Sequence, residues 1–165
     1  MAGAWSDAAA SLYEAGIAMI ESAVRACPEA LWAAGAPERS FWYTVFHVLF
    51  WTDVYLLGRY EDYAPPAPFT RDEMDPAGLY PSEPYAKETL LAFAAHCRAH
   101  VRSCFAALTD AQAAARCAIE RHDCSVAEMH LYNLRHVQHH AGQLQLLLRQ
   151  GAVTPPRWIG RGRDA

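Results

Sequence analysis

The chain has 165 residues, of which 53% are apolar, 12% aromatic and 19% charged, which is typical of one globular domain rather than of a disordered or fibrous protein. A formal net charge of −4 and a pI near 6.0 argue against a broad basic surface for nucleic acid, so a small-molecule substrate or a protein is the expected partner. The five cysteines contain no Cys-x-x-Cys pair, which argues against both a disulfide framework and a zinc knuckle.

The apolar segments do not predict export or membrane insertion. The start, MAGAWSDAAASLYEAG, lacks a positively charged region, and Asp7 and Glu14 interrupt its apolar residues, so no signal peptide is expected. The richest apolar run, FWYTVFHVLFWTDVYLLG, contains His47 and Asp53, which makes it a poor membrane span. We therefore expect a cytoplasmic protein that has no membrane partner.

Two long helices are predicted in the first third of the chain. The first covers residues 6–26, where Ser6 can cap the helix and apolar residues recur at helical spacing until Pro28. A short helical turn is expected in PEALW, and a second long helix follows at residues 39–60. One face of this second helix carries Tyr43, His47, Phe50, Trp51 and Val54.

A long crossover and two further helices complete the predicted fold. Residues 61–84 hold six prolines and no sustained period, which predicts an ordered crossover. A third helix is expected at residues 85–108, and a fourth begins at a capping box formed by Ser125 and Glu128 and ends at Gly151. The sequence thus predicts an all-α four-helix bundle in a single domain, residues 1–165, with a tail at about 151–165.

Two histidines of the fourth predicted helix, His136 and His140, are expected to share one face. Residues four apart differ by about 40° in direction and about 6 Å in height, so two imidazoles can reach one ion. The same face is apolar and should point into the bundle, where each unsatisfied ring nitrogen would cost about 1 to 3 kcal/mol. An ion, water or hydrogen bonds must therefore satisfy them. His139, rotated by about 100° from His140, is expected at the helix edge.

His47 is the expected third ligand of this set. It is the histidine of the second predicted helix and shares a face with aromatic residues. Alone it would be interpreted as a hydrogen-bonded core histidine. Together with the pair, it makes a three-nitrogen set built from facing helices, as is common for ligand sites in bundles.

A competing pair, His96 and His100, is also four residues apart. It lies beside the apolar stripe of the third predicted helix, which contains Cys97, Val101 and Cys104. We expect a solvated or helix-edge role for these two histidines, with ligation as the alternative. His122 and His130 have no spaced partner.

The histidine segments resemble the DinB/YfiT superfamily. HVLFW in the second helix supplies a lone histidine, and HVQHHAGQL in the fourth matches the motif H-x-x-x-H followed shortly by Gly-Gln. The resemblance covers most of residues 5–150. It implies an antiparallel-type four-helix bundle, often dimeric, with a three-histidine divalent-metal site at His47, His136 and His140, and in some members thiol-dependent transferase or isomerase activity.

Three imidazoles leave open positions on an ion such as Zn²⁺ or Ni²⁺, as in catalytic rather than closed structural sites. Such an ion can lower the pKa of bound water toward about 7 or hold a thiol as its thiolate. We therefore expect a metal-dependent hydrolase or a transferase that uses a low-molecular-weight thiol, and the resemblance favours the transferase. The alternatives are a non-enzymatic protein that binds or senses metal and, less favoured, bis-histidine haem ligation.

Several residues near the expected site have two interpretations. Asn133 and Gln143 can orient the ligands or can be ordinary polar residues at the bundle rim. Aromatic residues can line the pocket or simply pack in the core, and packing is favoured. These aromatic residues are Tyr43, Tyr60, Tyr63, Phe69 and Tyr80. The arginine-rich tail receives no functional role.

Overall fold

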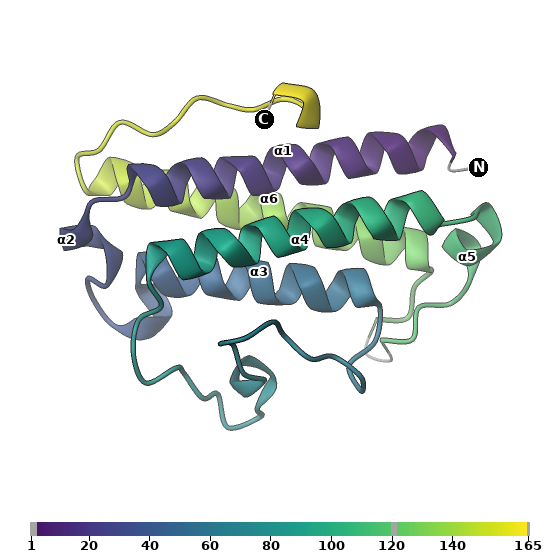
Figure 1. The fold of residues 1–165 in the computed structure, drawn as a ribbon, viewed down its shortest axis with the longest axis horizontal. Coiled ribbons are helices and arrows are strands. Elements are labelled where there is room, and N and C mark those ends of the chain that lie inside the picture. Colours follow the sequence, from purple (N-terminus) through teal and green to yellow (C-terminus); the bar gives the residue numbers. More distant parts are fainter. Residues whose placement is uncertain (1–2, 120–121, 165) are drawn as a thin grey trace.

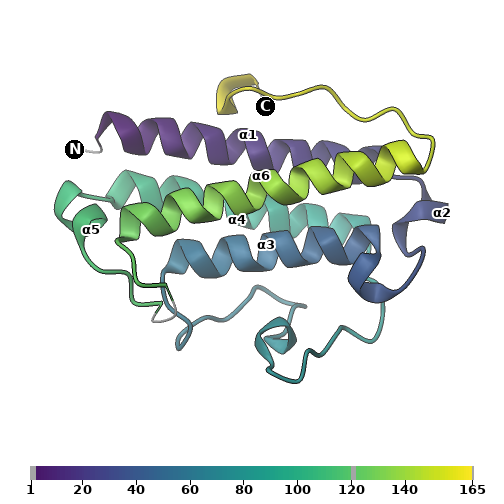
Figure 2. The same ribbon diagram turned by 180° about the vertical axis from the view of Figure 1, so that it is seen from behind.

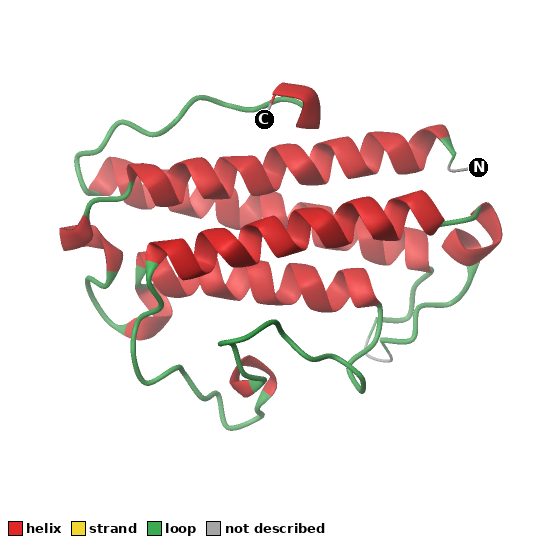
Figure 3. Ribbon diagram, in the orientation of Figure 1, coloured by secondary structure: helices red, strands yellow, loops and turns green. Residues whose placement is uncertain are grey.

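The computed structural model describes residues 3–119 and 122–164, and within these ranges every extended regular element is a helix (Figure 3). The all-α expectation is therefore confirmed. The α-helices are α1 (Ala4–Ala26), α2 (Glu29–Trp32), α3 (Phe41–Leu57), α4 (Lys87–Ala107), α5 (Asp110–Ala114) and α6 (Val126–Gln150), and the 3₁₀ turns are η1 (Pro37–Arg39), η2 (Asp72–Met74) and η3 (Gly162–Asp164).

The long helices α1, α3, α4 and α6 lie side by side around one core (Figures 1 and 2). α6 packs against α1 and α3, and α4 packs against the same two helices. α1 and α6 run in one direction while α3 and α4 run in the other (Figure 1). The antiparallel arrangement implied by the resemblance thus holds for α1 with α4 and for α3 with α6, whereas the pairs α1–α6 and α3–α4 are parallel.

The helix boundaries follow local capping chemistry. Ser40 accepts a hydrogen bond from the Tyr43 backbone N–H at 3.4 Å and caps α3, and the predicted capping box of Ser125 and Glu128 is present at the start of α6. The prediction for Ser6 was wrong. α1 begins at Ala4, and the Ser6 hydroxyl is buried inside the helix, where it donates to the Gly3 carbonyl at 2.7 Å.

The crossover between α3 and α4 is long because these helices are parallel, so the chain must return along the bundle before it can start α4. Aromatic side chains fix the crossover in place. Phe69 stacks on Phe46 of α3 and Phe93 of α4, with ring centroids 5.7 Å and 4.4 Å apart, and Tyr63 meets the ring of Phe50 edge-on at 5.1 Å. The crossover therefore covers one side of α3 and α4 as a packed segment.

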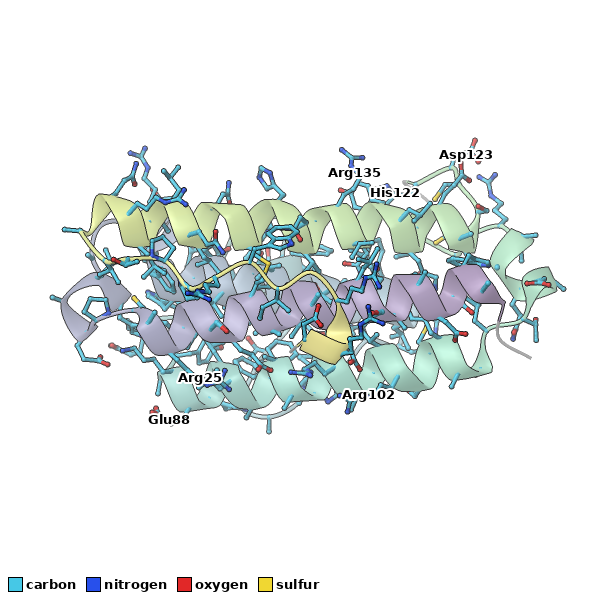
Figure 4. All side chains as sticks on the ribbon, turned by 90° about the horizontal axis from the view of Figure 1, so that it is seen from above. Arg25, Glu88, Arg102, His122, Asp123 and Arg135 are labelled. Carbon is cyan, nitrogen blue, oxygen red and sulfur yellow. The ribbon has the colours of Figure 1, made fainter. Side chains whose placement is uncertain are left out.

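The C-terminal tail returns along α1 (Figures 1 and 4). The Gly162 N–H donates to the Ser11 hydroxyl at 3.1 Å, which anchors η3 on that helix. Charged side chains such as Arg102 on α4 and Arg135 on α6 project from the outer faces (Figure 4). Among the described residues, no helix combines the length and apolarity that a membrane crossing requires.

α1 approaches α6 closely at Gly16. A Cβ at Gly16 would lie 2.7 Å from Val137 Cγ1, whereas a Cβ at Gly142 would meet no atom within 4 Å. We expect Gly16→Ala to lower the free energy of unfolding by about 1 to 3 kcal/mol, because α1 must move away from α6. Gly142→Ala, the matched control on α6, should raise the free energy of unfolding by about 0.5 to 1 kcal/mol through helix propensity alone.

Urea denaturation of the two variants and the wild type measures this difference. Equal stabilities for the two variants would contradict the close packing of α1 on α6.

Candidate metal centre

Three histidines meet where α3 packs on α6. His136 and His140 lie on successive turns of α6 with ring centroids 4.6 Å apart, and the His47 ring of α3 is 5.5 Å and 4.9 Å from them. One ring nitrogen from each of the three lies within 4.8 Å of the others. The structure thus brings together the three residues that the sequence singled out, which we call the histidine triad. His139 is exposed and is not part of this group.

Glu73, which the sequence analysis missed, orients the triad from the crossover. Its side chain in η2 is only 4% exposed. It accepts hydrogen bonds from His47 Nδ1 at 2.5 Å, the Tyr43 hydroxyl at 2.6 Å and Trp51 Nε1 at 3.1 Å. A carboxylate at Nδ1 places the proton on that nitrogen and leaves Nε2 of His47 free to ligate.

No local signal identifies Glu73 beforehand. Acidic residues at 72, 73 and 75 lie together in the crossover. Only the way the crossover packs over α3 decides that the carboxylate of Glu73 turns inward.

The two residues with a suggested orienting role have different surroundings. Gln143 Oε1 accepts a hydrogen bond from His140 Nδ1 at 2.7 Å, so the amide holds the ring and leaves Nε2 of His140 available. Asn133 is fully buried, and its amide donates to the Thr52 carbonyl at 3.0 Å. Asn133 therefore ties α6 to the backbone of α3 instead of holding a histidine ring through that bond.

Burial keeps the pair on α6 neutral. Burial and, to a smaller extent, repulsion from the neighbouring histidines together lower the pKa of His136 to about 3 and that of His140 to about 4. His136 Nδ1 is buried and makes no hydrogen bond within the described part of the chain. Divalent transition metals bind the neutral form of imidazole, and a bound ion can satisfy a buried ring nitrogen that lacks a hydrogen bond, so the residues present fit such an ion.

Two hollows reach the triad from different sides. The larger, of about 360 Å³, is lined by His47, Trp51, Tyr55, His122, Tyr132 and His136. The smaller, of about 220 Å³, is lined by Glu38, Tyr43, Thr44, His47, His140 and Gln143. A small molecule can therefore approach the ring nitrogens along a largely aromatic wall.

The other predicted aromatic residues have packing roles. Tyr63 and Phe69 are buried in the core, and Tyr80 packs on the ring of Tyr43 with centroids 5.0 Å apart. Of this set, Tyr43 lies closest to the chemistry, because its hydroxyl contacts Glu73 and its ring lines the smaller hollow.

The second histidine pair also has a partner that the sequence analysis did not predict. His96 and His100 lie at the edge of α4 and are partly exposed, as expected, but both rings contact Asp53 of α3. His100 Nδ1 lies 2.6 Å from Asp53 Oδ1, and His96 Nε2 lies 3.2 Å from the same oxygen. The expectation of a merely solvated role is therefore corrected.

No curated protein matches the chain. The DinB superfamily model matches residues 12–144, a range that contains all three histidines of the triad and Glu73. The chain therefore belongs to the DinB superfamily.

Proposed function

We propose that His47, His136 and His140 hold one divalent transition-metal ion inside a DinB-type four-helix bundle, and that the protein is a metal-dependent enzyme acting on a small molecule. The convergence of three imidazoles from two helices carries this proposal. Neutral rings at the pair on α6 and the carboxylate behind His47 support it, because metal-binding histidines commonly have such a partner on the outer nitrogen.

The reaction we propose is thiol transfer or hydrolysis. Three protein ligands leave coordination positions open, and the two hollows give small molecules access to them. When bound, the metal supplies Lewis-acid chemistry that makes a thiol or water nucleophilic at neutral pH. Glu73 and Gln143 hold the rings of His47 and His140, and the aromatic wall of the larger hollow excludes water and binds apolar parts of a substrate. The resemblance favours a low-molecular-weight thiol as the co-substrate.

Elemental analysis tests the metal site directly. We expect His47→Ala to lose about one equivalent of transition metal relative to the wild type, because two remaining imidazoles bind a divalent ion far more weakly. His139→Ala is the matched control on the same helix. It loses a contact with the amide nitrogen of Gln143 but keeps all three rings of the triad, so it should keep the wild-type metal content. Equal metal content in wild type and His47→Ala, with both folded, would rule the triad out as a metal site.

Glu73→Gln tests the orienting role of the crossover carboxylate. Loss of the negative charge behind His47 should weaken metal affinity by about 10- to 100-fold, the usual effect of removing such a partner. Asp75→Asn removes an exposed charge from the same crossover and should leave affinity unchanged. Competition with a chelator measures both affinities, and unchanged affinity in Glu73→Gln would show that the carboxylate does not act through the metal.

Turnover separates an enzyme from a non-enzymatic metal-binding or sensing protein. We expect consumption of a low-molecular-weight thiol with an electrophile, or of an ester, to require added metal and to disappear in His140→Ala while circular dichroism is unchanged. A panel of thiols, electrophiles and esters that gives no metal-dependent rate would favour the non-enzymatic alternative.

A further inference from the structure

The side of α3 turned toward α4 carries a second cluster of metal-ligating side chains. Asp53 follows His47 by six residues, which corresponds to about 9 Å along the helix and about 240° around it. The side chains of the two residues therefore lie on different sides of α3. Ligand atoms of Asp53, His96 and His100 all lie within 4.8 Å of one another, and none of these residues belongs to the triad.

We propose that Asp53, His96 and His100 form a second divalent transition-metal site, independent of the histidine triad. Two imidazoles and one carboxylate are a donor set used by both zinc and non-haem iron enzymes. It leaves coordination positions for a further ligand. The proposal does not require the triad to bind metal.

The distances suit a small divalent ion. Bonds of about 2.0 to 2.2 Å place neighbouring ligand atoms about 3 to 3.5 Å apart. His96 Nε2 already lies 3.2 Å from Asp53 Oδ1. His100 Nδ1, at 2.6 Å, makes a hydrogen bond to the same oxygen, and an ion would replace the shared proton with a shift of less than about 1 Å.

The burial of the Asp53 carboxylate favours the binding of a cation. The Asp53 side chain is only 4% exposed, and a buried carboxylate needs a compensating charge or several hydrogen bonds. The side chains of His96 and His100 are 44% and 25% exposed, so an ion can enter from their side. A divalent ion would offset the carboxylate charge without requiring either imidazole to be protonated.

The Tyr63 hydroxyl lies beside the same carboxylate. Tyr63 is 3% exposed, and its buried hydroxyl makes no well-formed hydrogen bond within the described part of the chain. Burial raises the pKa of the Tyr63 hydroxyl, and the nearby Asp53 carboxylate raises it further through its negative charge and a loose hydrogen bond. Tyr63 also lines the cavity that contains the cluster, so an ion with its remaining ligands, or a molecule bound to it, would meet this hydroxyl.

The cavity has room for such a ligand. Its volume is about 530 Å³, and it is lined by Asp53, Leu57, Asp62, Tyr63, Ala64, His96, Ala99, His100 and Ser103. Volumes of this size accommodate small organic molecules. The crossover forms one wall through Asp62, Tyr63 and Ala64, and α4 forms the other. An ion held by the cluster would therefore face a space that a small polar ligand can enter.

Metal stoichiometry of the full chain tests the proposal. Titration calorimetry and elemental analysis with Zn²⁺ should give about two equivalents for the wild type. Asp53→Asn should lose the Zn²⁺ of the second site and keep that of the triad. His47→Ala should do the reverse, and a variant with both changes should bind no Zn²⁺ at either site. Asp62→Asn is the matched control, because it removes an acidic charge from the same cavity without touching the cluster.

The outcomes separate the two sites. One equivalent that survives His47→Ala but disappears in Asp53→Asn would support the second site even if the triad proposal fails. Wild-type stoichiometry in both Asp53→Asn and His100→Gln would overturn the second site. His100→Gln also covers the case in which Asp53→Asn does not fold, because the His100 ring is partly exposed and its replacement leaves the buried carboxylate in place.

Discussion

The antiparallel packing of α3 on α6 is the constraint on which the candidate centre depends. The pair of histidines on α6 supplies only two ligand nitrogens, so the third must come from the other helix of the interface. The Asn133 amide fixes the register of that interface by bonding to the Thr52 carbonyl, and both groups are fully buried. On the other side of α6, Gly16 lets α1 approach Val137, the residue after His136. α6 is thus held between two helices at the level of its histidines.

The parallel packing of α3 and α4 determines how Glu73 and Tyr63 reach their positions. It requires a long return segment, and that segment supplies Glu73 to the triad and Tyr63 to the neighbouring cavity. Phe69, stacked between rings of both helices, explains why the return segment lies close enough to contribute these groups. A direct turn between antiparallel helices would leave the outer nitrogen of His47 exposed to water, without a buried carboxylate to orient it.

Features that depend on local spacing could be predicted from the sequence, whereas those that depend on the crossover could not. The four-residue spacing of His136 and His140 predicts their shared face, and Ser125 with Glu128 predicts where α6 begins. Glu73 could not be distinguished from its acidic neighbours, because tertiary packing alone turns it inward. In the sequence, Asp53 likewise only interrupts an apolar run. The packing of α4 against α3 is what brings it next to two histidines. The prediction that Ser6 caps the first helix failed at the local level. A serine hydroxyl can either cap a helix or donate to a backbone carbonyl three residues earlier, and the sequence does not distinguish the two.

Carboxylates accompany histidines on both sides of α3, but their positions differ in a way that separates their chemistry. Glu73 contacts the triad through a single ring nitrogen, His47 Nδ1, and shares its oxygens with a phenol and an indole. That arrangement fixes one tautomer and leaves the ligand nitrogen alone. Asp53 instead has two imidazoles directed at the same oxygen, whereas the nearby Tyr63 hydroxyl interacts with this carboxylate only loosely. A carboxylate that orients a ligand lies behind it, whereas one that lies between two imidazoles occupies the position of a ligand itself.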